Sequence, residues 1–152
     1  MTYKEWLDET ARKHRRIVDA LDGASVEEIV DFFEYEHMRR HHADYCPLYA
    51  QGKKCHEMED LNCYFCGCPY FRFCDEGIDV IDGKKRYSLC AIDAKEGKRF
   101  ETEEAIHQDC SECILPHRRA FVRKHFDRDW KRAMRESDAC GNSIVRKANE
   151  KI

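Results

Sequence analysis

Ten cysteines in a chain of 152 residues constrain the fold more than any other feature of this sequence. Four of them lie in residues 61–74, LNCYFCGCPYFRFC, together with five aromatic residues. Between Ala43 and Cys74 neither a helical nor a strand periodicity is sustained, and turn residues recur. Charged residues make up 38% of the chain, so the apolar core is modest for its length. We expect this segment to need ligands in order to fold.

The thiols could serve a disulfide framework, a reactive thiol site or a metal. The N-terminal stretch MTYKEWLDETARKH lacks the apolar core of a signal peptide, which predicts a cytoplasmic protein. Cytoplasmic thiols stay reduced, so we favour metal ligation over disulfides. No run of residues has the length and apolarity of a membrane span, and no membrane association is expected.

The spacing of the cysteines is typical of metal ligands. Cys63-x2-Cys66 and Cys110-x2-Cys113 each allow two thiolates to converge on one ion. Eight cysteines between residues 46 and 113 would fill two four-ligand sites, which we favour over one, and a nearby histidine could replace a thiolate. The predicted metal ligands are Cys46, Cys55, Cys63, Cys66, Cys68, Cys74, Cys110, Cys113, His56 and His117.

Two cysteines are left out of this set. Cys90 falls in a predicted strand, where we expect a small buried residue. Cys140 is expected to be a free thiol on the surface or in packing contacts. Spacing does not decide the metal: zinc is favoured, and a 4Fe–4S cluster, which also takes four thiolates, is the alternative.

Apolar periodicity predicts helices at both ends of the chain. Residues 3–21 carry an amphipathic stripe, and Gly23 is a suitable terminator. Ser25 and Glu28 form a capping box that predicts a second helix running to about Arg40. Residues 117–136 form the third predicted helix, with one apolar face.

The predicted fold class is α+β, with an irregular cysteine-ligated core and a short antiparallel meander between flanking helices. Turns at Asp82-Gly83 and Glu96-Gly97 indicate the meander. The predicted organisation is an N-terminal helical segment (1–42), a cysteine-rich metal-binding domain (43–117) with the meander inserted at 75–105, and a basic C-terminal helix and tail (118–152).

Charge is unevenly distributed along the chain. Residues 43–117 contain 15 acidic and 9 basic side chains, whereas residues 118–135 contain 8 basic and 2 acidic ones. The basic helix could bind nucleic acid. We favour a solvated helix whose charges face the acidic segment of the same chain, because the overall charge is −3 and no groove-reading motif is evident.

Several elements of the cysteine pattern resemble the cysteine-rich small domain family, a zinc-finger-like domain regarded as metal-binding. The matching residues are Cys46, the pair Cys55-His56, LNCYFCGCPYF at 61–71, Cys74, and DCSECILPH at 109–117. The resemblance covers about half of the chain and implies a metal site rather than an activity. Some members are joined to a cobinamide amidohydrolase, which links the family to anaerobic cobalamin metabolism. The insertion between Cys74 and Cys110 departs from the short form of the family.

The sequence does not identify an enzyme. Cys110 and Cys113 lack the βαβ surroundings of a thioredoxin-like pair, and no single nucleophile or general base stands out. We therefore expect a metal-binding protein, a zinc-stabilised interaction or accessory module whose partner is another protein. The alternative is an iron–sulfur protein of electron transfer or anaerobic cofactor metabolism.

Overall fold

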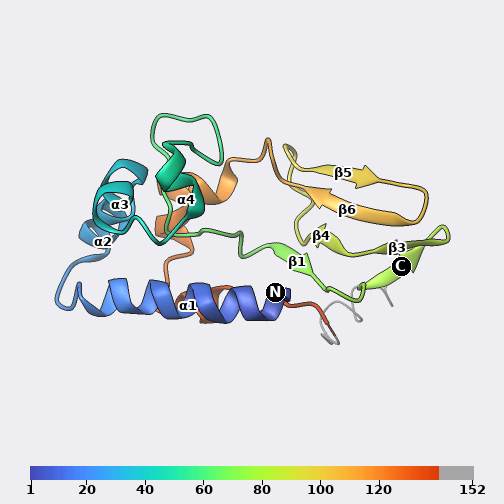
Figure 1. The fold of residues 1–152 in the computed structure, drawn as a ribbon, viewed down its shortest axis with the longest axis horizontal. Coiled ribbons are helices and arrows are strands. Elements are labelled where there is room, and N and C mark those ends of the chain that lie inside the picture. Colours follow the sequence, from blue (N-terminus) through green and yellow to red (C-terminus); the bar gives the residue numbers. More distant parts are fainter. Residues whose placement is uncertain (141–152) are drawn as a thin grey trace.

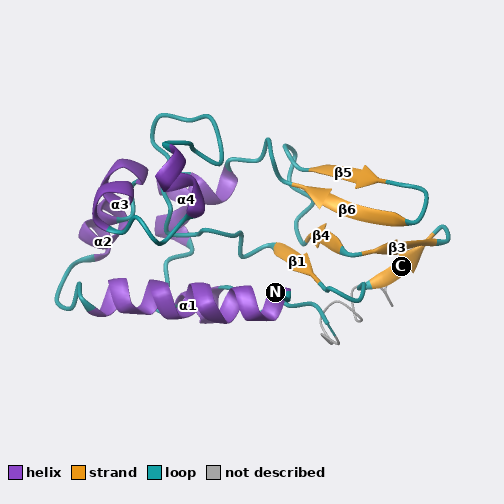
Figure 2. Ribbon diagram, viewed as in Figure 1, coloured by secondary structure: helices purple, strands orange, loops and turns teal. Residues whose placement is uncertain are grey.

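The computed structural model describes residues 1–140, and the tail beyond residue 140, part of the predicted C-terminal segment, lies outside the described residues. The helices gather in one part of the molecule and the four-stranded sheet lies in another (Figure 1). The cysteine-rich loops run between these two parts, as the secondary-structure colouring shows (Figure 2). The α+β class, with helices before and after short strands, is confirmed.

Helix α1 (Tyr3–Asp19) lies along one side of the molecule (Figure 1). Thr2 and Glu5 form a capping box at its start, which satisfies two backbone N–H groups that have no partner within the helix. Its apolar stripe is buried, as the spacing predicts. Gly23 follows with a φ of +85°, in the region that glycine adopts without strain.

The second predicted helix is interrupted. Helix α2 (Val26–Phe32) begins at the predicted capping box of Ser25 and Glu28, but a second helix, α3 (Tyr35–His41), follows after a break. At the break the backbone pairs with residues 61–63: Tyr35 N donates to Leu61 O, and Cys63 N donates to Phe33 O at 2.7 Å. The prediction of one helix to Arg40 is wrong because this long-range pairing replaces the helical bonds.

The predicted C-terminal helix is also divided, into the 3-10 turn η2 (Leu115–His117), helix α4 (Arg119–Lys124) and helix α5 (Trp130–Ala133). Asp129 caps α5 through Arg132 N, and the Asp127 side chain accepts from Asp129 N. These side-chain bonds to the backbone compete with the helix, which explains why an apolar stripe over 117–136 does not form one helix.

Six short strands form two sheets. Strand β1 (Phe71–Phe73) pairs with β4 (Ser88–Cys90). The other sheet has the order β2-β3-β6-β5, formed by Asp79–Ile81, Lys84–Arg86, Ala105–Asp109 and Lys98–Glu101 respectively.

The sheet is not a simple antiparallel meander, because β3 and β6 pair in parallel. The turn at Asp82-Gly83 joins β2 and β3 as predicted, and both residues have positive φ. The turn at Glu96-Gly97 does not close a hairpin, since it lies between β4 and β5, which belong to different sheets. Strand β5 instead pairs with β6. Strand β6 continues to Asp109, beyond the predicted insertion at 75–105.

One apolar core joins the helical segments to the cysteine-rich segment. Its members come from all five α-helices described, α1 to α5, and from residues 45–65, and the largest side chains that are fully buried there include Trp130, Tyr64, Phe33, Phe65 and Met38. Tyr64 and Phe65 stand in the ligand motif itself. The cysteines are therefore attached directly to the hydrophobic core.

The basic residues after 117 pair with acidic residues, but not with those predicted. Arg119 contacts Glu27 and Asp31, and Lys131 contacts Asp8. These carboxylates belong to α1 and α2, so the expectation that the acidic segment 43–117 faces the basic helix is corrected by these contacts. No helix within residues 1–140 combines the length and apolarity needed to cross a bilayer.

Candidate metal centre

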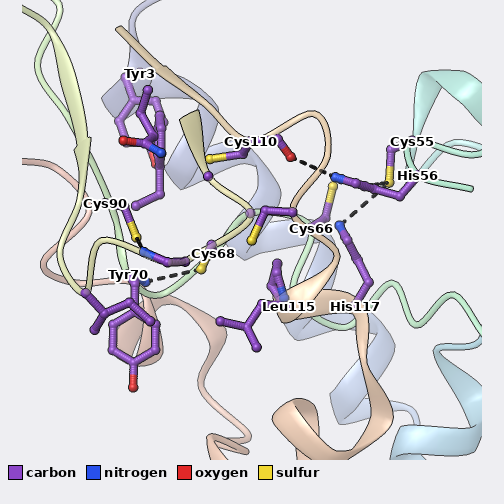
Figure 3. A pocket seen from close by; sticks show the side chains of 18 of the residues that line it. Tyr3, Cys55, His56, Cys66, Cys68, Tyr70, Cys90, Cys110, Leu115 and His117 are labelled. Atoms are coloured by element: carbon purple, nitrogen blue, oxygen red, sulfur yellow. Dashed lines mark hydrogen bonds between the residues drawn. The ribbon is translucent and has the colours of Figure 1, made fainter. Parts of the chain in front are cut away.

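Most of the predicted ligands meet around one pocket. Figure 3 shows Cys55, His56 and His117 on one side of this pocket and Cys68, Cys90 and Cys110 on the other. The cavity has a volume of about 400 Å³ and mostly apolar walls. Its lining includes the six residues just named together with Tyr3, Trp6, Cys66, Phe71, Ile92, Cys113, Leu115 and Pro116.

Cys46, Cys55, Cys63 and Cys66 form what we call the first thiol group. Burial raises the pKa of the Cys66 thiol to about 12, and the other three thiols contribute to this rise. Burial likewise raises the pKa of Cys63 to about 12, opposed by a hydrogen bond from Tyr49 and reinforced by Cys55 and Cys46. All four are predicted ligands, and the fold brings them together.

Cys68, Cys90, Cys110 and Cys113 form the second thiol group. Burial raises the pKa of Cys68 to about 11, and the neighbouring thiols of Cys90 and Cys113 add to this effect. Burial also raises the pKa of Cys110 to about 11, reinforced by the thiols of Cys113, Cys68 and Cys90. Cys113 N donates to Cys110 O, so this Cys-x2-Cys pair forms a tight turn.

Cys90 is the member of this group that the sequence analysis left out. It is the last residue of strand β4 and lies opposite Phe71 of β1. This pairing places the inserted segment beside the cysteine motif at residues 61–74. Its sulfur accepts a hydrogen bond from Ala94 N at 3.4 Å, so it is not only a packing residue. Residue spacing gives no signal for Cys90, because its position depends on which strands pair.

Cys74 lies outside both groups, because its sulfur is bonded to that of Cys140. The backbone explains this contact: Phe73 N donates to Ser137 O, and Ala139 N donates to Phe73 O. The structure differs from the prediction of a metal ligand at Cys74 and a free thiol at Cys140, because residues 137–139 align beside β1 and bring the two sulfurs together.

Cys55, His56 and His117 form the tightest set of potential ligands, which we call the Cys/His triad. Their ligand atoms all lie within 4.8 Å of one another, and within residues 1–140 no other group of three or more such residues meets this criterion. His56 Nδ1 is 3.2 Å from Cys55 Sγ, and His117 Nε2 is 3.7 Å from the same sulfur.

Backbone carbonyls hold both histidine rings. His56 Nε2 donates to Cys110 O at 3.0 Å, and His117 Nδ1 donates to Asn62 O at 3.0 Å. Asn62 N in turn donates to His117 O, so this contact is reciprocal. Burial lowers the pKa of His117, opposed by its bond to Asn62, which favours the neutral ring that a metal requires.

The triad is assembled from two distant stretches of chain. Cys55 and His56 follow the 3-10 helix η1 (Pro47–Gln51), which ends at Gly52 with a φ of +65°. His117 ends η2, which is fixed by Asn62 beside the break between α2 and α3. The position of His117 in the triad thus depends on the same segment, residues 61–63, whose backbone pairing interrupts the predicted helix.

The environment of these cysteines argues against a reactive thiol. A reactive thiol has a lowered pKa, whereas the pKa values of Cys63, Cys66, Cys68 and Cys110 are all raised. Such thiols are protonated at neutral pH and become good ligands only when an ion displaces the proton.

No protein-family model, curated protein or solved structure matches this chain. The resemblance to the cysteine-rich small domain family therefore stays a prediction.

Proposed function

We propose that this protein binds zinc through Cys55, His56 and His117 and acts as a zinc-stabilised interaction or accessory module. The observation that carries the proposal is the convergence of one sulfur and two ring nitrogens within 4.8 Å. Thiolate and imidazole are the ligands that zinc takes in proteins.

The distances within the triad suit a zinc ion. With Zn–S near 2.3 Å and Zn–N near 2.05 Å, tetrahedral geometry places sulfur and nitrogen about 3.6 Å apart. The two sulfur–nitrogen distances in the triad are 3.2 and 3.7 Å. An ion could therefore be bound with only small movements of the side chains.

The positions of the hydrogen atoms on the two histidine rings also suit a zinc ion. His56 Nε2 and His117 Nδ1 both carry hydrogen, because each donates to a carbonyl. In the neutral rings His56 Nδ1 and His117 Nε2 therefore carry lone pairs, and both face Cys55 Sγ. The thiol has one proton to share between two acceptors, whereas a metal ion satisfies all three atoms.

The fourth zinc ligand is assigned to a thiol of the first thiol group. These thiols are near enough to influence one another: Cys46 raises the pKa of Cys55, and Cys55 raises the pKa values of Cys63 and Cys66. A thiolate from this group would close a four-coordinate structural site, and such sites contribute folding free energy of order 10 kcal/mol. The zinc would join residues 55–56 to residue 117 and so fix a segment that has little regular structure. We further propose that a protein partner binds this module.

His56→Ala tests the zinc site, because His56 is half-buried and does not belong to the hydrophobic core, so that its removal costs little packing. We expect the variant to lose one bound zinc per chain, measured by metal analysis after dialysis. His107→Ala is the matched control, since His107 lies in strand β6 and stacks on Tyr87 away from the triad. The control should keep the zinc content of the unaltered protein.

Equal zinc in the unaltered protein and in His56→Ala would overturn the assignment of the triad. Single Cys→Ser changes at Cys46, Cys63 and Cys66, read by zinc affinity, identify the fourth ligand. The change that weakens zinc binding most, without altering the far-ultraviolet circular dichroism, marks it.

A further inference from the structure

Four thiols from three separate parts of the chain meet on the side of the cavity opposite the Cys/His triad. Cys68 precedes β1, Cys90 ends β4, and Cys110 and Cys113 follow β6. The register of the β1–β4 pair, with Phe71 opposite Cys90, brings the inserted segment back to Cys68. Figure 3 shows Cys68, Cys90 and Cys110 gathered there. The insertion therefore supplies the fourth thiol of this group.

Two of these sulfurs accept hydrogen bonds from backbone N–H groups in the same way. Tyr70 N donates to Cys68 Sγ at 3.4 Å, and Ala94 N donates to Cys90 Sγ at 3.4 Å. Backbone donors of this kind stabilise negative charge on sulfur, and hydrogen bonds to the sulfurs are among the features that tune iron–sulfur clusters. Cys90 thus has the surroundings of a thiolate ligand.

A cluster and a single zinc ion need different spacings of the thiols. Four thiolates on one zinc lie about 3.8 Å from one another, given Zn–S near 2.3 Å and tetrahedral geometry. Within residues 1–140 no three thiols form a group as close as the ligand atoms of the triad, which all lie within 4.8 Å of one another. A 4Fe–4S cluster binds each thiolate through a different iron and needs space between them.

The cavity provides that space. It measures about 400 Å³ and is lined by the four thiols of the second group together with apolar side chains such as Trp6, Phe71 and Leu115. Apolar walls limit the access of water and oxygen to metal–sulfur bonds. The triad contacts the same cavity from its other side, so the two sites would be neighbours with separate ligands.

We propose that Cys68, Cys90, Cys110 and Cys113 bind a 4Fe–4S cluster in this cavity, separate from the zinc site of the triad. The assignment rests on four thiols around one apolar space and on the backbone donors to two of them. His56 connects the two sites, because its Nε2 donates to Cys110 O while its Nδ1 faces the triad.

The experiment is anaerobic purification of the full chain, with reconstitution by ferrous iron and sulfide, followed by metal analysis and visible absorption. We expect a brown protein with about four irons and four sulfides per chain. Cys90→Ser should lose most of the iron and the colour while keeping zinc. The control is the double variant Cys74→Ser/Cys140→Ser, which alters two cysteines outside both groups and should keep both metals.

A reconstituted protein that stays colourless and contains zinc in place of iron would overturn the cluster, whatever the variants do. Iron retained in Cys90→Ser would overturn the ligand set. Should Cys90→Ser fail to fold, iron content and absorption of the unaltered chain still decide the proposal. Zinc lost from His56→Ala with iron retained would separate the zinc proposal from this one.

Discussion

His14 is a titratable side chain in the centre of the helical core. Its ring stacks on Phe33 at 4.8 Å and meets the edge of Tyr64 at 4.5 Å, and it is fully buried. Burial lowers its pKa to about 3, opposed by the backbone of Tyr64. The folded protein therefore binds this proton less readily than the unfolded chain, whose histidine titrates near 6.5.

His14 should make the fold sensitive to acid. Because its pKa is lower in the folded state, stability is lost as the pH falls below about 6.5, by up to about 1.4 kcal/mol per pH unit down to the folded pKa. We expect His14→Leu to shift the midpoint of acid unfolding to lower pH, as followed by circular dichroism. His41→Leu, at an exposed position, should leave the midpoint unchanged. Identical midpoints for His14→Leu and the unaltered protein would contradict this.

At the scale of single residues, spacing predicted candidate ligands but not which of them lie near one another. Cys63, Cys66, Cys110 and Cys113 were recognisable from their Cys-x2-Cys pairs. The positions of Cys74 and Cys90 depend on backbone pairing with residues 137–139 and with β1, respectively. Such contacts between distant residues leave no local signal in one sequence.

At the scale of helices and strands, the break between α2 and α3 depends on the buried side-chain amide of Asn62. Asn62 Nδ2 donates to Val30 O at 2.8 Å, and Asn62 Oδ1 accepts from Tyr64 N at 2.9 Å. The same residue holds His117 through its backbone. Asn62 therefore couples the end of α2 to the triad.

Asn62→Ala should destabilise the fold by about 2 kcal/mol, because it leaves the N–H of Tyr64 without a partner and removes one of the two donors to Val30 O. Urea unfolding in excess zinc measures the loss, and Asp60→Ala, at an exposed neighbouring position, is the control. We also expect weaker zinc binding in Asn62→Ala. A change below 0.5 kcal/mol, of about the size usual at the surface, would argue against this role for Asn62.

Local signals predicted where elements begin but not where they stop. The capping box at Ser25 and the turn at Asp82-Gly83 are both present, since each depends on neighbouring residues. The break near residue 33 and the parallel pairing of β3 with β6 depend on distant partners. Apolar periodicity does not predict these contacts, because the apolar face of the sequence continues across the interruption of a helix.

For the whole molecule, the helical core and the proposed metal sites would contribute different parts of the stability. The apolar cluster joins α1 to α5 and includes Tyr64 and Phe65. Residues 52–60, in contrast, are mostly exposed and contain no helix or strand. Metal removal should therefore loosen this loop before it unfolds the helices.

Limited trypsin digestion can follow this difference. After zinc is removed with a chelator, we expect cleavage after Lys54, next to Cys55, to become faster by about tenfold or more, since the loop opens locally. Cleavage after Arg16 within α1 should stay slow, because the apolar core still holds that helix. Equal acceleration at both positions would indicate global unfolding, and no acceleration would indicate that zinc does not order the loop.

Gly67 lies between Cys66 of the first thiol group and Cys68 of the second, with a φ of +125°. A Cβ atom at this position would lie 3.2 Å from both Trp6 and Met134, so the backbone is closely packed as well as conformationally restricted. Occupation of either site would order the backbone on one side of this glycine. Binding at the other site would then cost less conformational entropy. Zinc and cluster are therefore expected to load with positive cooperativity, each binding more tightly to a chain that already holds the other.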